Sequence, residues 1–153
     1  MGQDDVIEPS RDLVGQAALS NAAESLRPQT PFMYRTWADF ELRESDLTQS
    51  IFTGSHWRKL SLWDLTLRRC DLDGMRVEQC IFDSVDFRNA DVRATTFSRC
   101  EFRGCRFDHA LIDDCAFVES TIRECTFHNT TQRDLRFIDC TLSHYTTAES
   151  SFT

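Results

Sequence analysis

Large apolar residues recur at every fifth position over more than a hundred residues of this chain. Counted in steps of five from Leu42 to Phe152, 21 of 23 positions are large and apolar, and Gln132 and Thr147 are the exceptions. Only 41% of the whole sequence is hydrophobic, so chance does not produce such a column. A period of five fits neither an α-helix nor a simple strand. It predicts a chain that turns a corner after every fifth residue.

The other four columns of the repeat have distinct compositions. The position two places before each large residue (i) is i−2. Most of its residues are small or medium, and all seven cysteines fall there. Side chains alternate along a strand, so i and i−2 should share the inward face. Positions i−1 and i+1 then point outward, and i+2 forms the corner. These three columns are mainly polar, as an exposed surface requires.

The motif resembles that of the pentapeptide-repeat proteins, which is a small residue, a polar one, Leu or Phe, then two polar ones. Good copies are residues 90–94 (ADVRA), 100–104 (CEFRG) and 125–129 (CTFHN). The resemblance covers residues 37–153. It implies an all-β solenoid, a right-handed four-sided β-helix with four pentapeptides per coil and about six coils.

Four sides per coil stack residues that are 20 apart, and this predicts the core. Gln132 would then be buried, which favours either a local bulge or an internally hydrogen-bonded rung. The expected core side chains are Phe82, Phe87, Phe97, Phe102, Phe107, Phe117, Phe127 and Phe137, with Cys80, Cys100, Cys105 and Cys125 beside them.

Residues 1–36 lack the repeat and form a separate segment. Ser10 is a plausible N-cap, and apolar residues near one side predict a helix over residues 11–27 that ends before Pro28. This segment should cap the first coil. The alternative is a partner-binding or secretion-signal segment. At the other end the repeats run out at Phe152, and an uncapped coil predicts end-to-end homodimerisation through exposed backbone groups.

The distribution of Cys and His argues against catalysis. The cysteines point inward, whereas His56, His109, His128 and His144 occupy outward or corner columns, so no Cys-His arrangement forms. No Cys-x-x-Cys pair suggests a metal, and a rod filled with side chains has no substrate pocket. We therefore expect no enzyme activity, no cofactor and no metal. Cys80 with Cys100, and Cys105 with Cys125, lie within disulfide reach, but free thiols are expected in a reducing compartment.

The charge and the outward columns direct attention to protein partners. A net charge of −8 disfavours direct nucleic-acid binding, and no stretch is apolar enough to span a membrane. The start of the chain does not resemble a secretory signal, which indicates cytoplasm or delivery without a cleaved signal peptide. Arg68, Arg69 and Arg88 mark a basic side. The candidate partner-binding residues are Asp71, Asp73, Asp91, Asp113 and Asp114 on an acidic side, with Trp63, Val118 and Ile138 in other outward positions.

Two functional hypotheses follow. The first is a scaffold or adaptor that acts through the surface of a rigid rod, such as a component or effector of a bacterial secretion system. The second comes from the family resemblance, because some pentapeptide-repeat proteins mimic duplex DNA and bind DNA gyrase or topoisomerase IV. The acidic side favours this mimicry, and the many arginines dilute it.

Overall fold

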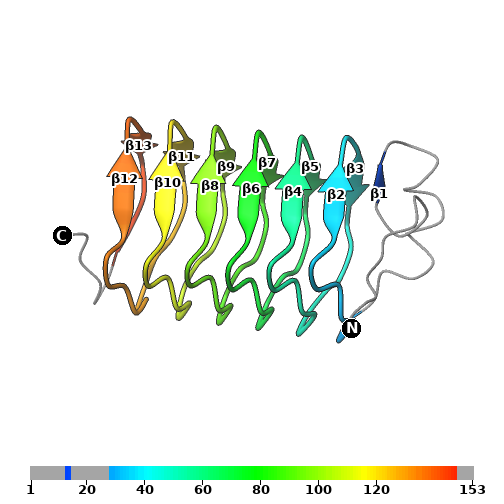
Figure 1. Ribbon diagram of the computed structural model, residues 1–153. Helices are drawn as coiled ribbons and strands as arrows, with labels where there is room; N and C mark the ends of the chain where they lie inside the picture. The colour runs from blue at the N-terminus through cyan, green and yellow to red at the C-terminus, as the bar shows by residue number, and fades with distance from the viewer. Residues whose placement is uncertain (1–12, 15–27, 148–153) are drawn as a thin grey trace.

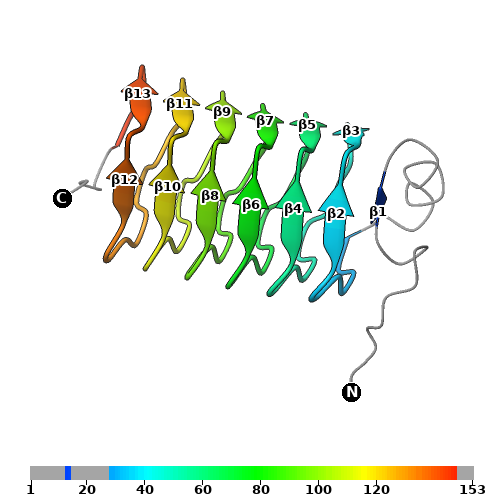
Figure 2. The same cartoon turned by 45° about the horizontal axis from the view of Figure 1, so that its top comes forward.

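The chain forms a rod of stacked turns in a computed structural model that describes residues 13–14 and 28–147 (Figures 1 and 2). Each element pairs in parallel with the one 20 residues further on, as Phe97 does with Phe117. One ladder is the β2 side, with strands β2 (Thr36–Ala38), β4 (His56–Arg58), β6 (Arg76–Glu78), β8 (Thr96–Ser98), β10 (Ala116–Val118) and β12 (Arg136–Ile138). The next is the β3 side, with β3 (Glu41–Arg43), β5 (Ser61–Trp63), β7 (Ile81–Asp83), β9 (Glu101–Arg103), β11 (Thr121–Arg123) and β13 (Thr141–Ser143).

Two further ladders of isolated bridges close the four-sided cross-section. On the Arg68 side, bridges join Asp46, Thr66, Asp86, Arg106, Thr126 and Thr146. On the Asp91 side, bridges join Pro31, Ile51, Asp71, Asp91, Leu111 and Thr131. The all-β solenoid is therefore confirmed, with about five turns from β2 to β13. The expectation of about six also counted residues 148–153, which lie outside the described residues.

The five sequence columns have the burial that their period predicted. From Phe32 to Phe127 every residue at position i is buried, and each corner residue from Gln29 to His144 is exposed. The corner backbone has positive φ at all of these i+2 positions, from 49° at Glu119 to 69° at Gly74. Only three corner residues are glycine. The left-handed conformation costs energy for other residues, and the corner amides offset it by bonding the next turn, as Gln49 does to the Arg68 carbonyl.

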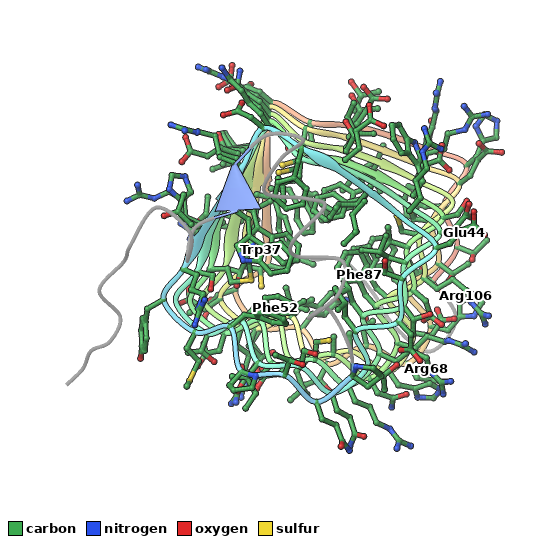
Figure 3. The ribbon with its side chains drawn as sticks, turned by 90° about the vertical axis from the view of Figure 1, so that its right-hand side faces the viewer. Trp37, Glu44, Phe52, Arg68, Phe87 and Arg106 are labelled. Carbon is green, nitrogen blue, oxygen red and sulfur yellow. The ribbon has the colours of Figure 1, made fainter. Side chains whose placement is uncertain are left out.

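Aromatic side chains fill the interior in ladders parallel to the rod axis (Figure 3). Phe87, Phe107 and Phe127 stack nearly flat, with ring centroids 4.6 and 4.9 Å apart. Phe82 stacks on Phe102 at 4.7 Å. On the β2 side Phe97 stacks on Phe117 at 4.9 Å, as the 20-residue spacing predicted. The eight predicted core phenylalanines all lie inside, although Phe137 is only half-buried in the last turn.

The small residues at i−2 do more than fill space, because they hydrogen-bond the preceding turn. Thr95 Oγ1 accepts from the Met75 amide at 3.2 Å and donates to the Leu72 carbonyl at 2.6 Å. Five thiols make the same kind of bond to the carbonyl 23 residues earlier, namely Cys70, Cys100, Cys105, Cys115 and Cys140. The interpretation of these cysteines as small apolar fillers was therefore incomplete.

The first turn begins earlier than the repeat suggested. Phe32 is buried in the i column, and Pro31 bridges Ile51. Upstream, β1 (Leu13–Val14) pairs in parallel with Trp37 and Ala38 of β2. The predicted helix over 11–27 is wrong at residues 13–14, where the free edge of β2 is paired instead. The rest of that helix and Ser10 lie outside the described residues, and the described part contains no helix.

The interruption at Gln132 does not shift the register. Leu111 still bridges Thr131, and Phe117 pairs with Phe137. The Thr130 hydroxyl donates to Gln132 Oε1 at 3.4 Å. Gln132 is half-buried, not buried as predicted, but it does make the internal hydrogen bond, and no bulge forms. In this last turn the inner side chains Leu135, Phe137, Cys140 and Leu142 are only half-buried.

Candidate interaction surface

The filled interior leaves the outward columns as the chemically accessible part of the rod. All five predicted aspartates lie on or at the corner of the Asp91 side, as do Arg93 and Arg133. Trp63 lies on the β3 side, whereas Val118 and Ile138 are register partners on the β2 side. The predicted partner-binding residues therefore occupy three different sides and do not form one patch.

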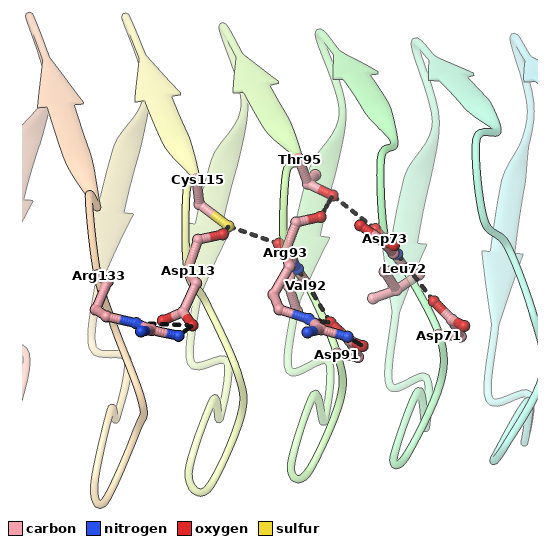
Figure 4. Close-up of polar contacts among 10 residues, drawn as sticks. All are labelled: Asp71, Leu72, Asp73, Asp91, Val92, Arg93, Thr95, Asp113, Cys115 and Arg133. Atoms are coloured by element: carbon pink, nitrogen blue, oxygen red, sulfur yellow. Dashed lines mark hydrogen bonds and ion pairs between the residues drawn. The ribbon is translucent and has the colours of Figure 1, made fainter.

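Arginines neutralise much of the Asp91 side (Figure 4). Arg93 contacts both carboxylate oxygens of Asp91, at 2.8 and 2.6 Å. Arg133 holds Asp113 Oδ2 at 3.0 Å. These carboxylates are also the less exposed partners, since Asp113 is 15% exposed and Arg133 is 80% exposed. The acidity inferred from the column composition is thus reduced in space.

Several aspartates at position i−1 have a structural role that the sequence interpretation missed. On the Arg68 and Asp91 sides, the described backbone bonds do not use the amide at i+1. An aspartate two residues earlier accepts that hydrogen bond instead, in an Asx-type turn. The amide–carboxylate distances are 3.0 Å for Asp46, 3.1 Å for Asp71, 3.0 Å for Asp86 and 3.2 Å for Asp91. The recurring Asp at i−1 on these two sides was the available signal.

The carboxylate contacts lower the pKa values of these aspartates. The side-chain hydrogen bond from Thr48 holds the pKa of Asp46 below its ordinary value, and that from Arg93 does the same for Asp91. Burial alone would raise the pKa of Asp86, but the bonds donated by Arg88 outweigh it and the pKa is lowered. A carboxyl with a depressed pKa adds stability above its unfolded-state value and loses it as the pH falls through the folded-state value.

Variants of Asp86 should separate the effect of its hydrogen bond to the Arg88 amide from the effect of its negative charge. Asp86→Asn keeps an oxygen for the Arg88 amide, whereas Asp86→Ala should lose about 1–2 kcal/mol of unfolding free energy through the lost hydrogen bonds. The deficit of Asp86→Asn relative to the unaltered chain should begin to shrink below about pH 4, where the unfolded-state carboxyl takes up a proton, and should vanish once the pH falls through the lower folded-state pKa. Urea titrations at neutral and acid pH measure both effects. A deficit of Asp86→Asn that does not change with pH would contradict this assignment.

The Arg68 side is less basic than its sequence suggested. Arg88 binds Asp86, with 2.7 Å between Nη2 and Oδ2, and Arg106 lies 3.4 Å from Asp108. Arg68 and Arg106 point outward on this side in Figure 3. Asp108 is buried and accepts the His128 amide at 3.0 Å, so its charge is enclosed within the network. Exposed guanidinium groups thus cover partly hidden carboxylates here.

The remaining candidates also have defined surroundings. Arg43 lies over the Trp63 ring, 3.7 Å from its centroid, in a cation–π contact that leaves Trp63 half-buried. On the β2 side Ala116 is buried, Val118 is half-buried and Ile138 is 43% exposed. This apolar strip ends at the last described turn.

The described residues hold no group of three or more His, Cys, Asp or Glu that could bind a metal, and no helix among them could span a membrane. The seven thiols are unpaired. Burial raises the pKa of Cys70 and Cys115 to about 12, which suppresses the reactive thiolate. The surface of the described turns carries shallow depressions. One is lined by Gly74, Met75, Arg76, Glu78, Thr96 and Ser98, and another by Gln79, Cys80, Ile81, Arg99, Cys100, Glu101, Glu119 and Thr121.

Solved structures similar to this chain are distant. QnrB1, a plasmid-mediated fluoroquinolone resistance protein, is 14% identical with a TM-score of 0.40, over 76% of this chain and 73% of that chain. HetL, from the cyanobacterium Nostoc sp. strain PCC 7120 and involved in heterocyst differentiation regulation, is 9% identical with a TM-score of 0.36, over 92% of this chain and 100% of that chain. Rfr23 from the cyanobacterium Cyanothece 51142 is 8% identical with a TM-score of 0.32, over 83% and 95%.

At these identities the likeness concerns the fold alone. No curated protein matches the sequence. The family described as pentapeptide repeat region matches residues 40–115, where the five-residue columns are most regular. With that match and the four-sided stack of turns built from its repeat, the chain belongs to the pentapeptide repeat family.

Proposed function

We propose that this chain is a non-enzymatic protein-interaction module, a rigid rod whose outer side chains bind a protein partner. The observation that carries the proposal is the filled interior. Phe82, Phe102 and Phe107 are 0% exposed, and in the described turns these ladders fill the inside of the rod, so its outer side chains are the ones a partner can contact. In a bacterial cell such a rod would act in the cytoplasm as an adaptor, or as an effector delivered by a secretion system.

A photo-crosslinking scan tests this role. A benzoylphenylalanine residue is placed in turn at Trp63, Leu111, Thr126 and Ile138, one on each side of the rod. In cells of the source organism we expect a discrete covalent adduct from one side and none from the opposite side. Equal adducts from all four positions, or none from any, would contradict a specific binding surface.

DNA mimicry with a type II topoisomerase as partner is a second proposal, supported by the carboxylates that arginines leave free. No Arg, Lys or His nitrogen of the described residues lies within 4.0 Å of the Asp71, Asp73 or Asp134 carboxylates, and Asp114 is 4.0 Å from Arg136. Such a mimic should inhibit gyrase supercoiling, and Asp71→Asn with Asp73→Asn should weaken the inhibition. No inhibition at micromolar excess of the rod would remove this role.

The partner could also be a second copy joined at the last described turn, as the sequence predicted. The half-buried Phe137 and Leu142 and the 40% exposed Tyr145 supply apolar surface there. Sedimentation at tens of micromolar separates the two states, and a monomer would exclude this end-to-end dimer.

A further inference from the structure

The Asp91 side is not uniform along the rod. Its first two turns expose large apolar residues, since Met33 is 43% exposed and Ile51 is 36% exposed. Asp71 and Asp73 follow in the next turn, and Asp71 is the bridge partner of Ile51. Beyond them, Asp91 is bound by Arg93. The unneutralised carboxylates therefore lie directly beside the apolar residues.

Tyr34 completes the apolar end through a contact with a glycine corner. A Cβ atom at Gly54 would lie 2.5 Å from Tyr34 Cδ1 and Cε1, so the ring lies against that corner and only glycine leaves room for it. Tyr34 is nevertheless 67% exposed. Most corners carry non-glycine residues at the same positive φ, so backbone conformation alone does not require glycine at position 54. Glycine at position 54 therefore lets one face of the Tyr34 ring pack against the corner while the other face stays exposed to solvent.

The next corner along the same edge, at Gly74, is not covered by a side chain. No atom lies within 4 Å of a Cβ built at Gly74, and the shallow depression lined by Met75, Arg76 and Ser98 begins there. A corner without a side chain lets a partner backbone approach the rod closely at Gly74, next to the Tyr34 ring that covers Gly54. An extended segment can therefore run along this edge beside both the apolar residues and the carboxylates.

We propose that Met33, Tyr34, Ile51, Asp71 and Asp73 form one docking surface for an extended protein segment in which a pair of apolar side chains is followed by a pair of basic ones, so that each face of the segment carries both kinds. This rests on the proposed interaction function and names its partner class. Tyr34 and Met33 supply the kind of anchor that dominates interface energy, and the apolar contact would be desolvated there. Asp71 and Asp73 select for positive charge, and they repel nucleic acids and anionic lipid surfaces.

A labelled peptide measures this preference directly. The probe is fluorescein-labelled Ser-Leu-Val-Arg-Lys-Thr, in which each face of the extended chain carries one apolar and one basic residue. Its two controls replace Arg and Lys by Glu, or Leu and Val by Ser. By fluorescence anisotropy we expect the first peptide to bind with a dissociation constant on the order of 100 μM at low salt, and more weakly as salt screens the charges. Both control peptides should bind at least about tenfold more weakly.

Matched variants locate the binding. The double variant Asp71→Asn with Asp73→Asn keeps a side-chain oxygen at position 71 that can accept the backbone amide of position 73. It removes both negative charges and should weaken binding about tenfold. Tyr34→Asn should do the same, because asparagine tolerates the positive φ and only the ring is lost. Asp134→Asn with Asp139→Asn removes the same charge from two corners of the last turn and should leave affinity unchanged.

Equal weakening by the two aspartate pairs would overturn the proposal, because the peptide would then respond only to net charge. Binding of the glutamate peptide as tight as that of the basic peptide would overturn it as well. The crosslinking scan separates this failure from failure of the proposed function. A specific adduct at another side, without peptide binding here, would preserve the interaction role and reject this surface.

Discussion

Replacing Phe107 by alanine should lower the free energy of unfolding by about 3–5 kcal/mol, a large fraction of the stability of a typical domain. Phe107 is 0% exposed and stacks on Phe87 and Phe127 at 4.6 and 4.9 Å. The turns above and below are fixed by backbone ladders, so the walls of the cavity cannot close. Urea titration followed by circular dichroism and by fluorescence of the buried Trp37 and Trp57 measures the loss.

The matched control is Phe137→Ala in the last described turn. Phe137 is half-buried and stacks on Phe117 at 5.3 Å. Because much less surface is lost to a cavity there, the expected cost is about 1–2 kcal/mol. A solenoid couples each turn only to its neighbours, so position along the rod should set the size of the effect. Equal losses for the two variants would contradict this account.

The interior was predictable from the sequence because one geometric rule generates it. Once the chain turns after each fifth residue, i and i−2 must face inward and residues 20 apart must stack. Phe97 and Phe117 are register partners for this reason. Gln132 follows the same rule, since its hydrogen bond with Thr130 keeps the register where a polar side chain enters the inner column.

The beginning of the rod was harder to predict. Pro28 was interpreted as lying just after the end of a helix, but three residues later Pro31 already occupies an i−1 position of the first turn. In later turns the amide at i−1 bonds to the preceding turn, as Ile51 does to Thr30. The first described turn on this side has no such predecessor, so a proline loses no bond there. Phe32 was missed because the column was counted only from Leu42.

The surface was the least predictable part. The sequence columns tell which side of the rod a residue lies on, but not which charged side chains contact one another. Arg93 binds Asp91 two residues earlier on the same side, whereas Arg133 binds Asp113 20 residues earlier. The first spacing could have been recognised as an i−1 and i+1 pair. The second depends on side-chain reach between turns. A composition-based estimate of acidity therefore overstated the free charge on this side.

Replacing Thr95 by valine should destabilise the rod by about 1–3 kcal/mol although the two side chains have nearly the same volume. Thr95 is 1% exposed, and its hydroxyl accepts the Met75 amide and donates to the Leu72 carbonyl. Figure 4 shows the bond to Leu72. Valine would bury both backbone groups without a partner at the inner edge of a corner. Thermal and urea unfolding with identical buffers measure the difference.

Thr95→Ser is the matched control, since serine keeps the hydroxyl and loses only a methyl group. It should cost about 1 kcal/mol, the transfer free energy of one buried carbon. The comparison isolates hydrogen bonding from packing, which a single variant cannot do. If valine proved as stable as threonine, the i−2 column would act only by size, and the thiols of Cys70 and Cys115 would then be fillers after all.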